Sequence, residues 1–397
     1  MISSVHYRGS LVFSILRDIL RYTIVMRYAM ADVEMISRSV AEMAATQFKG
    51  LADPYRVVAL TAEKRMAFLH NPFVDDMGSH CQAIGVKDKI AIGGEIHFPL
   101  YWSVRGEQVK ALYGSTTFVA KEYRKTELGL RFPEFRKKVY PSDVTGGAGC
   151  SQMMIKVLRY RKELVFLMPR MIMLFKSRSV VEMKLRGWIS KLVTAVIDFG
   201  LQLYWCCMKF IVGFKLRGYV FETVKDNDYA TVQQVADLIA TDTHPYAELH
   251  DVCWLKWHLT ESFTKDGPMK LTAVKRKGKL IGFYMTKVRF HEQASARGFK
   301  NVWLGSIMEW QTQPDEEAAL PWILLHASCA FKGTVDAVEI VTTDSKVTSL
   351  LRLVMWHQVG DSNFTFHIHA GALKEDPEIL LPENWRLRPA MGDVGLS

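Results

Sequence analysis

The stretch TTFVAKEYRKTELGLRF, residues 116–132, begins with the pattern of a strand and becomes helical. Arg124 and Gly129 stand where a strand-to-helix turn would hold a phosphate, because the N–H groups and dipole of a helix N-terminus attract anions. Glycine also lets a backbone approach such a ligand closely. Glu127 occupies a position where loops of this kind ordinarily have glycine. We therefore expect an anion site that is weakened but not abolished.

The composition is that of a folded globular protein and excludes a disordered or fibrous chain. Of 397 residues, 49 % are hydrophobic and 23 % are charged, and the length suits two ordinary domains or one large one. The net charge of +10 favours an acidic partner: nucleic acid, an anionic membrane, a nucleotide cofactor or an anionic sugar. The six cysteines have no paired spacing, which predicts reduced thiols in the cytoplasm and no zinc site.

The two halves of the chain repeat one order of predicted elements: strand, helix, hairpin, strand, helix, strand, helix. Residues 22–43 predict a short strand and then a helix from Asp32, with Met35 and Ile36 on its apolar face. Residues 219–240 predict the same pair of elements, with the helix starting at Asp228.

Hairpins and strands follow in the same order in both halves. The hairpins are expected at residues 83–98 and 273–288, the central strands at 111–119 and 302–310, and the helices after them at 124–138 and 316–331. Gly93, Gly94 and Gly282 lie inside the second strand of their hairpins, where a bulge or a close backbone approach is expected. The second half closes with a strand at 337–344 and a helix at 347–357, and the first with a glycine-rich loop at 144–152 and a helix at 151–162.

The predicted fold class is therefore α/β, with two tandem domains that each contain a mixed, mostly antiparallel sheet flanked by helices. We place an amphipathic N-terminal extension at residues 1–21, the first domain at 22–178, a helical linker at 179–216 and the second domain at 217–397. Residues 191–214 are apolar enough to resemble a membrane segment, but Asp198 and Lys209 interrupt them. This favours a buried linker helix over a membrane span, with a membrane-surface helix between the two.

VAKEYRKTELG, residues 119–129, is similar to the acyl-CoA motif of the GNAT acetyltransferase superfamily: valine, a short turn, Glu-Tyr-Arg, two residues, glycine, one residue and glycine. Only the penultimate glycine differs, and it is Glu127 here. The whole chain resembles tandem GNAT proteins, a group that includes enzymes modifying bacterial cell-wall peptides and surface polysaccharides. The second half has QTQPDEEAA at the matching place, whose acidic residues would repel a pyrophosphate. We expect it to be a degenerate copy without cofactor.

The resemblance implies acetyl-CoA or another acyl-CoA as co-substrate, no metal, and direct attack of an amine on the thioester. It implies that the cofactor is bound by Phe118, Val119, Ala120, Arg124, Lys125, Thr126, Glu127, Leu128 and Gly129. A main-chain N–H within residues 118–120 would bind the thioester oxygen.

The remaining roles are assigned more loosely. Glu95, on the neighbouring hairpin strand, is the candidate general base, although an exposed structural glutamate is the more common explanation. Tyr160 is the candidate acid for the leaving thiolate. Asn71 and Pro72, in FLHNP, are candidate substrate contacts. His367 and His369 share one strand face, but without a third ligand they do not predict a metal site.

Three functions stay open. The first is an N-acyltransferase acting on a small-molecule amine such as an amino sugar or an amino-acid derivative. The second is a relative that takes its acyl group from aminoacyl-tRNA, which the positive charge would suit. The third is a non-catalytic scaffold that touches membranes through residues 1–21 and 191–214; DNA is not expected as a partner.

Overall fold

The computed structural model describes residues 32–39, 62–74, 80–88, 90–124, 126–139, 142, 144–148, 152–160, 162–225, 227–291, 301–358, 364–369 and 376–391. The chain divides into two compact units. The first comprises residues 1–60, 78–97 and 114–142, and the second comprises residues 61–77, 98–113 and 143–397. The predicted N-terminal extension lies outside the described residues. The predicted domain boundaries stay a prediction.

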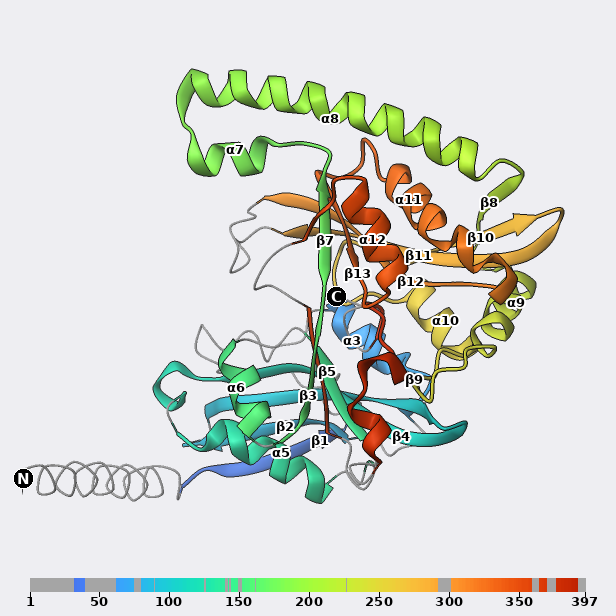
Figure 1. The fold of residues 1–397 in the computed structure, drawn as a ribbon. Coiled ribbons are helices and arrows are strands. Elements are labelled where there is room, and N and C mark those ends of the chain that lie inside the picture. Colours follow the sequence, from blue (N-terminus) through green and yellow to red (C-terminus); the bar gives the residue numbers. More distant parts are fainter. Residues whose placement is uncertain are drawn as a thin grey trace, which may run out of the picture. The chain divides into compact units, whose positions relative to one another are not determined.

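The first unit holds a sheet in the order β1-β2-β3-β4 and the helix α5 (Figure 1). Its elements are β1 (Glu34–Ser39), β2 (His80–Lys87), the first part of β3 (Ile90–Val104), the last part of β4 (Glu107–Val119), the 3-10 turn η2 (Lys121–Tyr123) and α5 (Leu128–Val139). Leu128 and Phe132 of α5 pack against Val33, Ala83 and Ile92 to form the core of this unit. The apolar first turns of α5 thus close over the hairpin.

The helix predicted from Asp32 is wrong, because residues 34–39 form strand β1. β1 pairs antiparallel with β2, beginning with Glu34 opposite Val86. Val33 and Met35, two residues apart, both pack on the core of the first unit, which is the spacing of a strand rather than of a helix. Pairing with a neighbouring strand has therefore overridden a helical pattern in the sequence. The strand predicted before it lies outside the described residues.

The second unit contains a seven-stranded sheet in the order β14-β7-β13-β12-β11-β10-β8. These strands are β7 (Arg170–Leu174), β8 (Tyr219–Thr223), β10 (Lys270–Arg276), β11 (Lys279–His291), β12 (Val302–Thr312), β13 (Ala337–Val341) and β14 (His357–Gln358). Its helical elements are α7 (Arg178–Lys184), α8 (Gly187–Lys215), α9 (Tyr229–Ile239), α10 (Val252–Thr260), η3 (Pro314–Ala319), α11 (Leu320–Ala330) and α12 (Ser345–Leu353). Both predicted hairpins are confirmed, at β2–β3 and β10–β11.

The second unit also contains elements that do not belong to the seven-stranded sheet or to the helices named above. They are α3 (Ala62–Leu69), β5 (Val144–Ala148), α6 (Gln152–Tyr160), β6 (Leu164–Met168), β9 (Tyr246–Glu248), β15 (Phe364–His369), η5 (Pro377–Leu380), η6 (Pro382–Asn384) and β16 (Trp385–Arg386). Residues 144–148 were expected to be a glycine-rich loop and are instead strand β5, paired with β15. The missing side chains of Gly146 and Gly147 do not prevent a strand that is paired and buried.

The start of the second repeat is confirmed. Asp228 caps α9, and its carboxylate accepts a hydrogen bond from the N–H of Thr231. Val232, Val235 and Leu238 lie on the buried face of that helix, as their spacing predicts.

Strands β7 and β15 each pair with strands that are distant in the sequence. β7 precedes the predicted linker, yet it pairs with β13 and β14 in the seven-stranded sheet. β15 comes late in the chain, yet it pairs with β5 and β6. The buried Glu339 of β13 fastens β7 in place, because its carboxylate binds Arg170 at 2.5 Å and Arg289 at 2.6 Å. Burial raises the pKa of Glu339, but Arg170 and Arg289 outweigh it and lower the pKa to about 2.

The helix expected within the linker is present as α8, but the expectation that it is buried is wrong. Of its residues, only Ser190, Trp205, Met208 and Val212 are buried. Trp205 stacks on Phe175 and donates from Nε1 to the carbonyl of Leu174 at 2.8 Å. One narrow face of α8 thus joins the core formed by α11, α12 and the sheet, while the rest faces outward.

Candidate functional site

The end of β4 is held against a bulge in β3. Gly85 pairs with Gly93 and Val86 pairs with Ala91, so Ile92 is an extra residue in β3. The carbonyl of Ile92 accepts a hydrogen bond from the N–H of Ala120 at 2.8 Å. A side chain at Gly93 would come within 2.9 Å of the carbonyl oxygen of Phe118, so glycine is required there by packing. The sequence correctly predicted a bulge or a close approach at this glycine.

The turn after β4 is built from short-range hydrogen bonds. Tyr123 N–H donates to the carbonyl of Ala120, and Thr126 N–H donates to that of Tyr123. The hydroxyl of Thr126 donates to Tyr123 O at 2.6 Å and accepts from Leu128 N–H at 3.3 Å. Thr126 therefore caps α5 in the manner of an N-terminal threonine. Helix α5 starts at Leu128, later than the predicted Arg124, because η2 precedes it.

The predicted phosphate-binding residues lie around this helix start. The side chain of Arg124 is exposed, and its Nε donates to the carbonyl of Val119 at 3.1 Å. Glu127 has no positive φ, and its carbonyl accepts from Arg131 N–H at 3.1 Å, so its backbone continues into the helix without needing glycine. Lys125 lies outside the described residues.

Gly129 has no packing reason to be glycine. A Cβ built there would meet only the Cγ2 of Val119, at an ordinary 3.8 Å. Glycine inside a helix lowers stability by about 0.5–1 kcal/mol relative to alanine. Neither packing nor helix propensity therefore explains a glycine in the first turn of α5, where backbone N–H groups lack helical acceptors.

The second unit repeats this backbone closely. Ile281 is the extra residue in β11, and its carbonyl accepts from the N–H of Gln313 at 2.8 Å. A side chain at Gly282 would come within 2.9 Å of the carbonyl oxygen of Gln311. Ala120 has φ −55° and ψ 143°, and Gln313 has φ −57° and ψ 148°. The internal repeat predicted from the sequence is thus present in the backbone at this point.

The side chains after the turn differ between the copies. In the second copy Asp315, Glu316 and Glu317 form an acidic first turn of η3. Glu316 accepts from the hydroxyl of Tyr219 at 2.6 Å and from Arg276 at 2.8 Å. Counted from Ala120 and Gln313, these three carboxylates stand where the first copy has Glu122, Tyr123 and Arg124, so the second copy is the more negative of the two at this turn.

Glu95 was expected to be exposed, and instead it is 6 % exposed. Its carboxylate binds Arg136 of α5 at 3.0 Å, and Nε2 of His97 lies 3.6 Å from its other oxygen. Burial and the charge of Arg136 hold the pKa of His97 well below its usual value. These contacts give Glu95 a structural role between β3 and α5, and its role as a base stays a prediction.

The other predicted residues lie in the second unit. The side-chain amide of Asn71 donates to the carbonyl of Pro99 at 3.2 Å, and its oxygen accepts from Phe73 N–H at 2.9 Å. The oxygen thus stabilises the turn and the amide joins it to β3, and Pro72 beside it is exposed. Tyr160 ends α6 and is 90 % exposed. Their roles in substrate binding and catalysis stay predictions.

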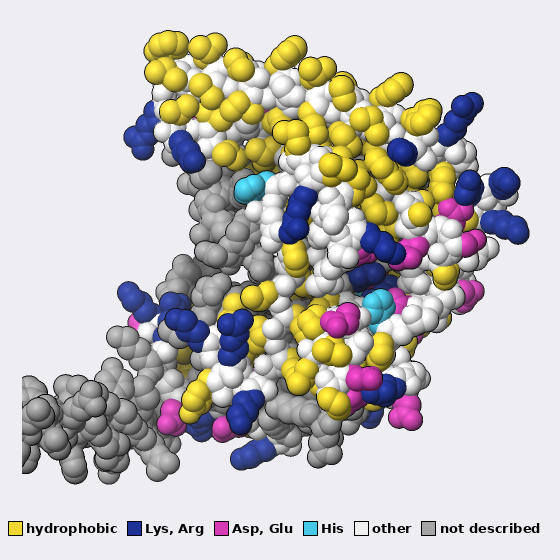
Figure 2. Space-filling model, in the orientation of Figure 1, with side chains coloured by type: hydrophobic (Ala, Val, Ile, Leu, Met, Phe, Trp, Pro, Cys, Tyr) yellow, Lys and Arg dark blue, Asp and Glu magenta, His cyan; other side chains and the backbone are white. Residues whose placement is uncertain are grey.

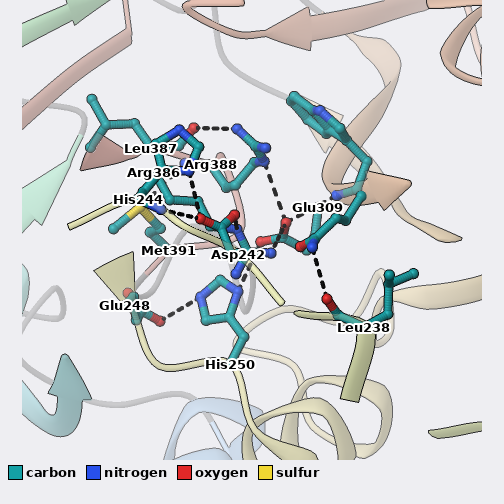
Figure 3. A network of polar contacts seen from close by, with 12 residues as sticks. Leu238, Asp242, His244, Glu248, His250, Glu309, Arg386, Leu387, Arg388 and Met391 are labelled. Atoms are coloured by element: carbon teal, nitrogen blue, oxygen red, sulfur yellow. Dashed lines mark hydrogen bonds and ion pairs between the residues drawn. The ribbon is translucent and has the colours of Figure 1, made fainter. Parts of the chain in front are cut away.

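A buried network of charges lies around Glu309 of β12, and sequence analysis did not find it (Figure 3). Nδ1 of His250 lies 2.8 Å from the carboxylate of Glu309, and Nε2 lies 3.3 Å from Glu248. Arg386 binds Glu309 at 2.9 Å and Asp242 at 3.3 Å. A glutamate within the apolar strand VWLGSIMEWQT was a signal of a buried charge, but its partners are distant in the sequence.

The charges of this network support one another. Burial raises the pKa of Glu309, but Arg386 and His250 outweigh it and lower the pKa to about 2. Burial lowers the pKa of His250, but Glu309 and Glu248 outweigh it and raise the pKa above the ordinary value. Glu309 and His250 thus each favour the charged form of the other, and such a buried pair stabilises the fold only while both partners stay in place.

The C-terminal segment, residues 385–391, contacts β12 beyond the point where β12 stops pairing with β13. β12 pairs with β13 from Leu304 to Ile307, and beyond that point Met308 is an extra residue opposite β11. The carbonyl of Met308 accepts from the N–H of Ala390 at 2.9 Å. The guanidinium of Arg388 lies over the ring of Trp310, 4.6 Å from its centre. In the second unit the opening beside the central strand is thus occupied by the chain itself.

Comparison with solved structures shows which fold this chain has. No family model and no curated protein matches the sequence. Two structures of N-myristoyltransferase from Saccharomyces cerevisiae with bound myristoyl-CoA are 12 % identical to this chain and cover 85 % of it. Their TM-scores are 0.53 and 0.54, with 83 % and 79 % of their own chains covered. A GCN5-related N-acetyltransferase from Anabaena variabilis, 11 % identical, covers 85 % of this chain and 73 % of its own with a TM-score of 0.46.

The chain has a tandem GNAT-type fold. The predicted fold class, mixed sheets flanked by helices in two repeats, is confirmed. At this level of identity the likeness concerns the fold alone, so the chemistry depends on the residues of this chain.

Proposed function

We propose that the chain is an N-acyltransferase that transfers an acyl group from acyl-CoA to an amine. The observation that carries this proposal is Gly129: the first turn of α5 keeps a glycine that packing does not require, beside the cap formed by Thr126. A diphosphate on this turn would meet helix N–H groups and the positive end of the dipole. Arg124, exposed beside it, adds attraction for the phosphates.

The fold supports the same donor. Structures of N-myristoyltransferase with bound myristoyl-CoA share it over most of both chains. An acyl-CoA on the first unit would present its thioester at the end of β4, near Phe118 and Val119. The N–H of Ala120 is already bonded to Ile92, so the donor to the thioester oxygen is proposed at one of the two preceding residues.

The reaction needs no covalent enzyme intermediate. The amine nitrogen forms a bond to the acyl carbon, the carbon–sulfur bond breaks, and the CoA thiolate takes up a proton, which leaves an amide and CoA. A base must remove a proton from the ammonium before attack. Glu95→Gln tests the predicted base: loss of turnover with unchanged unfolding temperature supports catalysis, whereas a lower unfolding temperature supports the structural role of its Arg136 contact.

Calorimetric titration with CoA, acetyl-CoA and myristoyl-CoA tests the proposal. Arg124→Glu should weaken binding by at least about tenfold, because it places a negative charge beside the pyrophosphate. Lys138→Glu makes the same charge change at the other end of α5, where its side chain is exposed, and should change affinity by less than about twofold. If the wild-type protein binds none of the three ligands, or if both variants behave alike, the proposal is wrong.

The net charge of +10 supports one alternative donor, aminoacyl-tRNA. Such a donor predicts tRNA binding that falls steeply with salt and does not respond to CoA. Because the titration above gives no heat in that case, the two donors are distinguished in one set of experiments. The acceptor is then sought among amines of the predicted classes, amino sugars and amino-acid derivatives, by following release of the CoA thiol.

A further inference from the structure

Helix α8 presents an apolar face to the outside of the molecule. Trp188 is 73 % exposed, Phe199 71 %, Phe210 78 % and Phe214 70 %. Leu192, Val196 and Leu203 lie between them on the same face, as their helical spacing requires. Figure 2 shows hydrophobic side chains along the whole length of this helix. An exposed apolar surface of this extent is unusual on a protein that acts alone in water.

The opposite face keeps α8 on the protein. Trp205, Met208 and Val212 are buried in the core of the seven-stranded sheet and its helices. The hydroxyl of Tyr204 donates to the carbonyl of Val354 at 2.6 Å, and Asp198 accepts from the N–H of Ser177 at 2.7 Å. The helix is long and apolar enough to cross a bilayer. Crossing would remove these contacts, whereas lying along a surface preserves them.

Cations lie on one flank of the apolar face and near both of its ends. Lys191 and Lys209 are exposed and stand eighteen residues apart, which is five helical turns, so both lie on the same flank. Further exposed cations stand before and after them: Lys184, Arg186, Lys215 and Arg217. The only carboxylate of α8 is Asp198, and it is turned toward Ser177. Figure 2 shows lysine and arginine side chains near both ends of the helix.

We propose that α8 binds the surface of a bilayer containing anionic lipids, with its axis along the membrane. The aromatic rings would enter the boundary between headgroups and acyl chains, while the lysine stems extend toward the phosphates. A second copy of the chain fits this face less well, because its cations would meet the same cations across the interface. The proposal does not depend on the proposed acyltransferase activity.

Flotation of the full chain with lipid vesicles tests it. Wild-type protein should float with vesicles of phosphatidylcholine and phosphatidylglycerol, should float less at high salt, and should bind phosphatidylcholine alone much more weakly. Phe210→Glu should lower partitioning by at least about tenfold, because it places a charge where an apolar ring would be buried. Leu353→Glu makes a comparable change on α12, where the side chain is 79 % exposed, and should leave partitioning unchanged.

Two further variants separate the contributions. Lys191→Glu combined with Lys209→Glu should remove most of the preference for phosphatidylglycerol. Trp188→Phe should remove a component of tryptophan fluorescence that brominated lipids quench in the wild-type protein. None of these side chains is buried, so the unfolding temperature should not change.

Three results would overturn the proposal. The first is that the wild-type chain floats with neither kind of vesicle. The second is that Phe210→Glu binds vesicles as the wild type does. The third is a dimer in sedimentation experiments that Phe210→Glu abolishes, because the face would then be an interface between copies.

Discussion

The two copies of the strand-turn-helix segment share a backbone and differ in charge. In both, a bulged isoleucine accepts a hydrogen bond from the first residue after the central strand, and a Cβ added at the neighbouring glycine would come within 2.9 Å of a carbonyl oxygen. The first copy continues with Glu122, Tyr123 and Arg124, and at the matching positions the second has Asp315, Glu316 and Glu317. The bulge and its glycine thus belong to the fold, whereas the charge of the residues after the turn differs between the copies.

In the second copy the C-terminal segment also packs beside the central strand β12. Residues of the C-terminal segment bind the bulge at Met308 and the carboxylate of Glu309. The energy of that contact comes from ionised groups that are buried together, so each must keep its partner. The second copy, which we expect to bind no cofactor, thus has contacts at this place that stabilise the fold.

Acid should weaken the buried network around Glu309. The pKa of Glu309 is about 2 in the folded chain and about 4.5 in the unfolded chain. Its contribution is therefore fully present above pH 4.5 and is lost as the pH falls toward 2, a loss of roughly 3 kcal/mol. His250, with a raised pKa, stays protonated over this range and contributes no change there.

Urea unfolding at several pH values measures this effect. Glu309→Gln should be less stable than the wild type near neutral pH and should show a smaller loss of stability in acid. Glu317→Gln is the control, because this glutamate forms an exposed pair with Lys346. A wild-type chain whose stability does not fall between about pH 4.5 and pH 3 would contradict the assignment of ionised groups.

The shared backbone predicts equal costs in the two copies. Gly93→Ala and Gly282→Ala each place a Cβ 2.9 Å from a backbone oxygen that cannot move without shifting a strand. Each should lower the free energy of unfolding by about 2 kcal/mol. Gly200→Ala, on α8 with nothing within 4 Å of its Cβ, should instead be neutral or slightly stabilising. Unequal costs for Gly93 and Gly282 would show that the likeness of the two bulges is superficial.

Local sequence patterns predicted the repeated elements and missed what depends on distant pairing. Both hairpins, the glycine bulges, and the helix after Asp228 follow from spacing within a few residues. Residues 34–39 have a pattern compatible with a helix, and only the neighbouring β2 makes them a strand. The pairings of β7 and β15 join segments far apart in the chain, which no local pattern specifies.

The residues of the candidate site were likewise predictable where they depend on neighbouring residues, and not where they depend on distant ones. Thr126 and Gly129 lie at the start of α5, where a motif of neighbouring residues placed them. Glu95 was correctly placed on the hairpin, but its burial depends on Arg136, forty-one residues away. The partners of Glu309 are further apart still, so a buried charge was detectable in the sequence while its network was not.

Gly129→Ala should separate stability from binding in the first copy. The added methyl group fits the folded chain, since its nearest neighbour is Val119 at 3.8 Å, and alanine should raise the free energy of unfolding by about 0.5–1 kcal/mol. The same methyl group should lower CoA affinity several-fold, because it lies over the N–H groups of the first turn. Denaturation and titration of the same variant check both effects. A variant that is more stable and binds CoA as well as the wild type would show that this glycine does not face the cofactor.

The smallest expected effect concerns Glu127, the one position where the first copy departs from the acyl-CoA motif. Because its φ is not positive, the handicap should be one of charge near the pyrophosphate, worth up to about 1 kcal/mol. Glu127→Gln and Glu127→Gly should then tighten CoA binding equally, by about threefold, and Glu134→Gln, farther along α5, should not. If only the glycine variant tightens binding, the side chain hinders the approach of the backbone to the ligand. If neither the wild type nor either variant binds CoA, the first copy is a remnant, and the difference in charge between the copies has another cause.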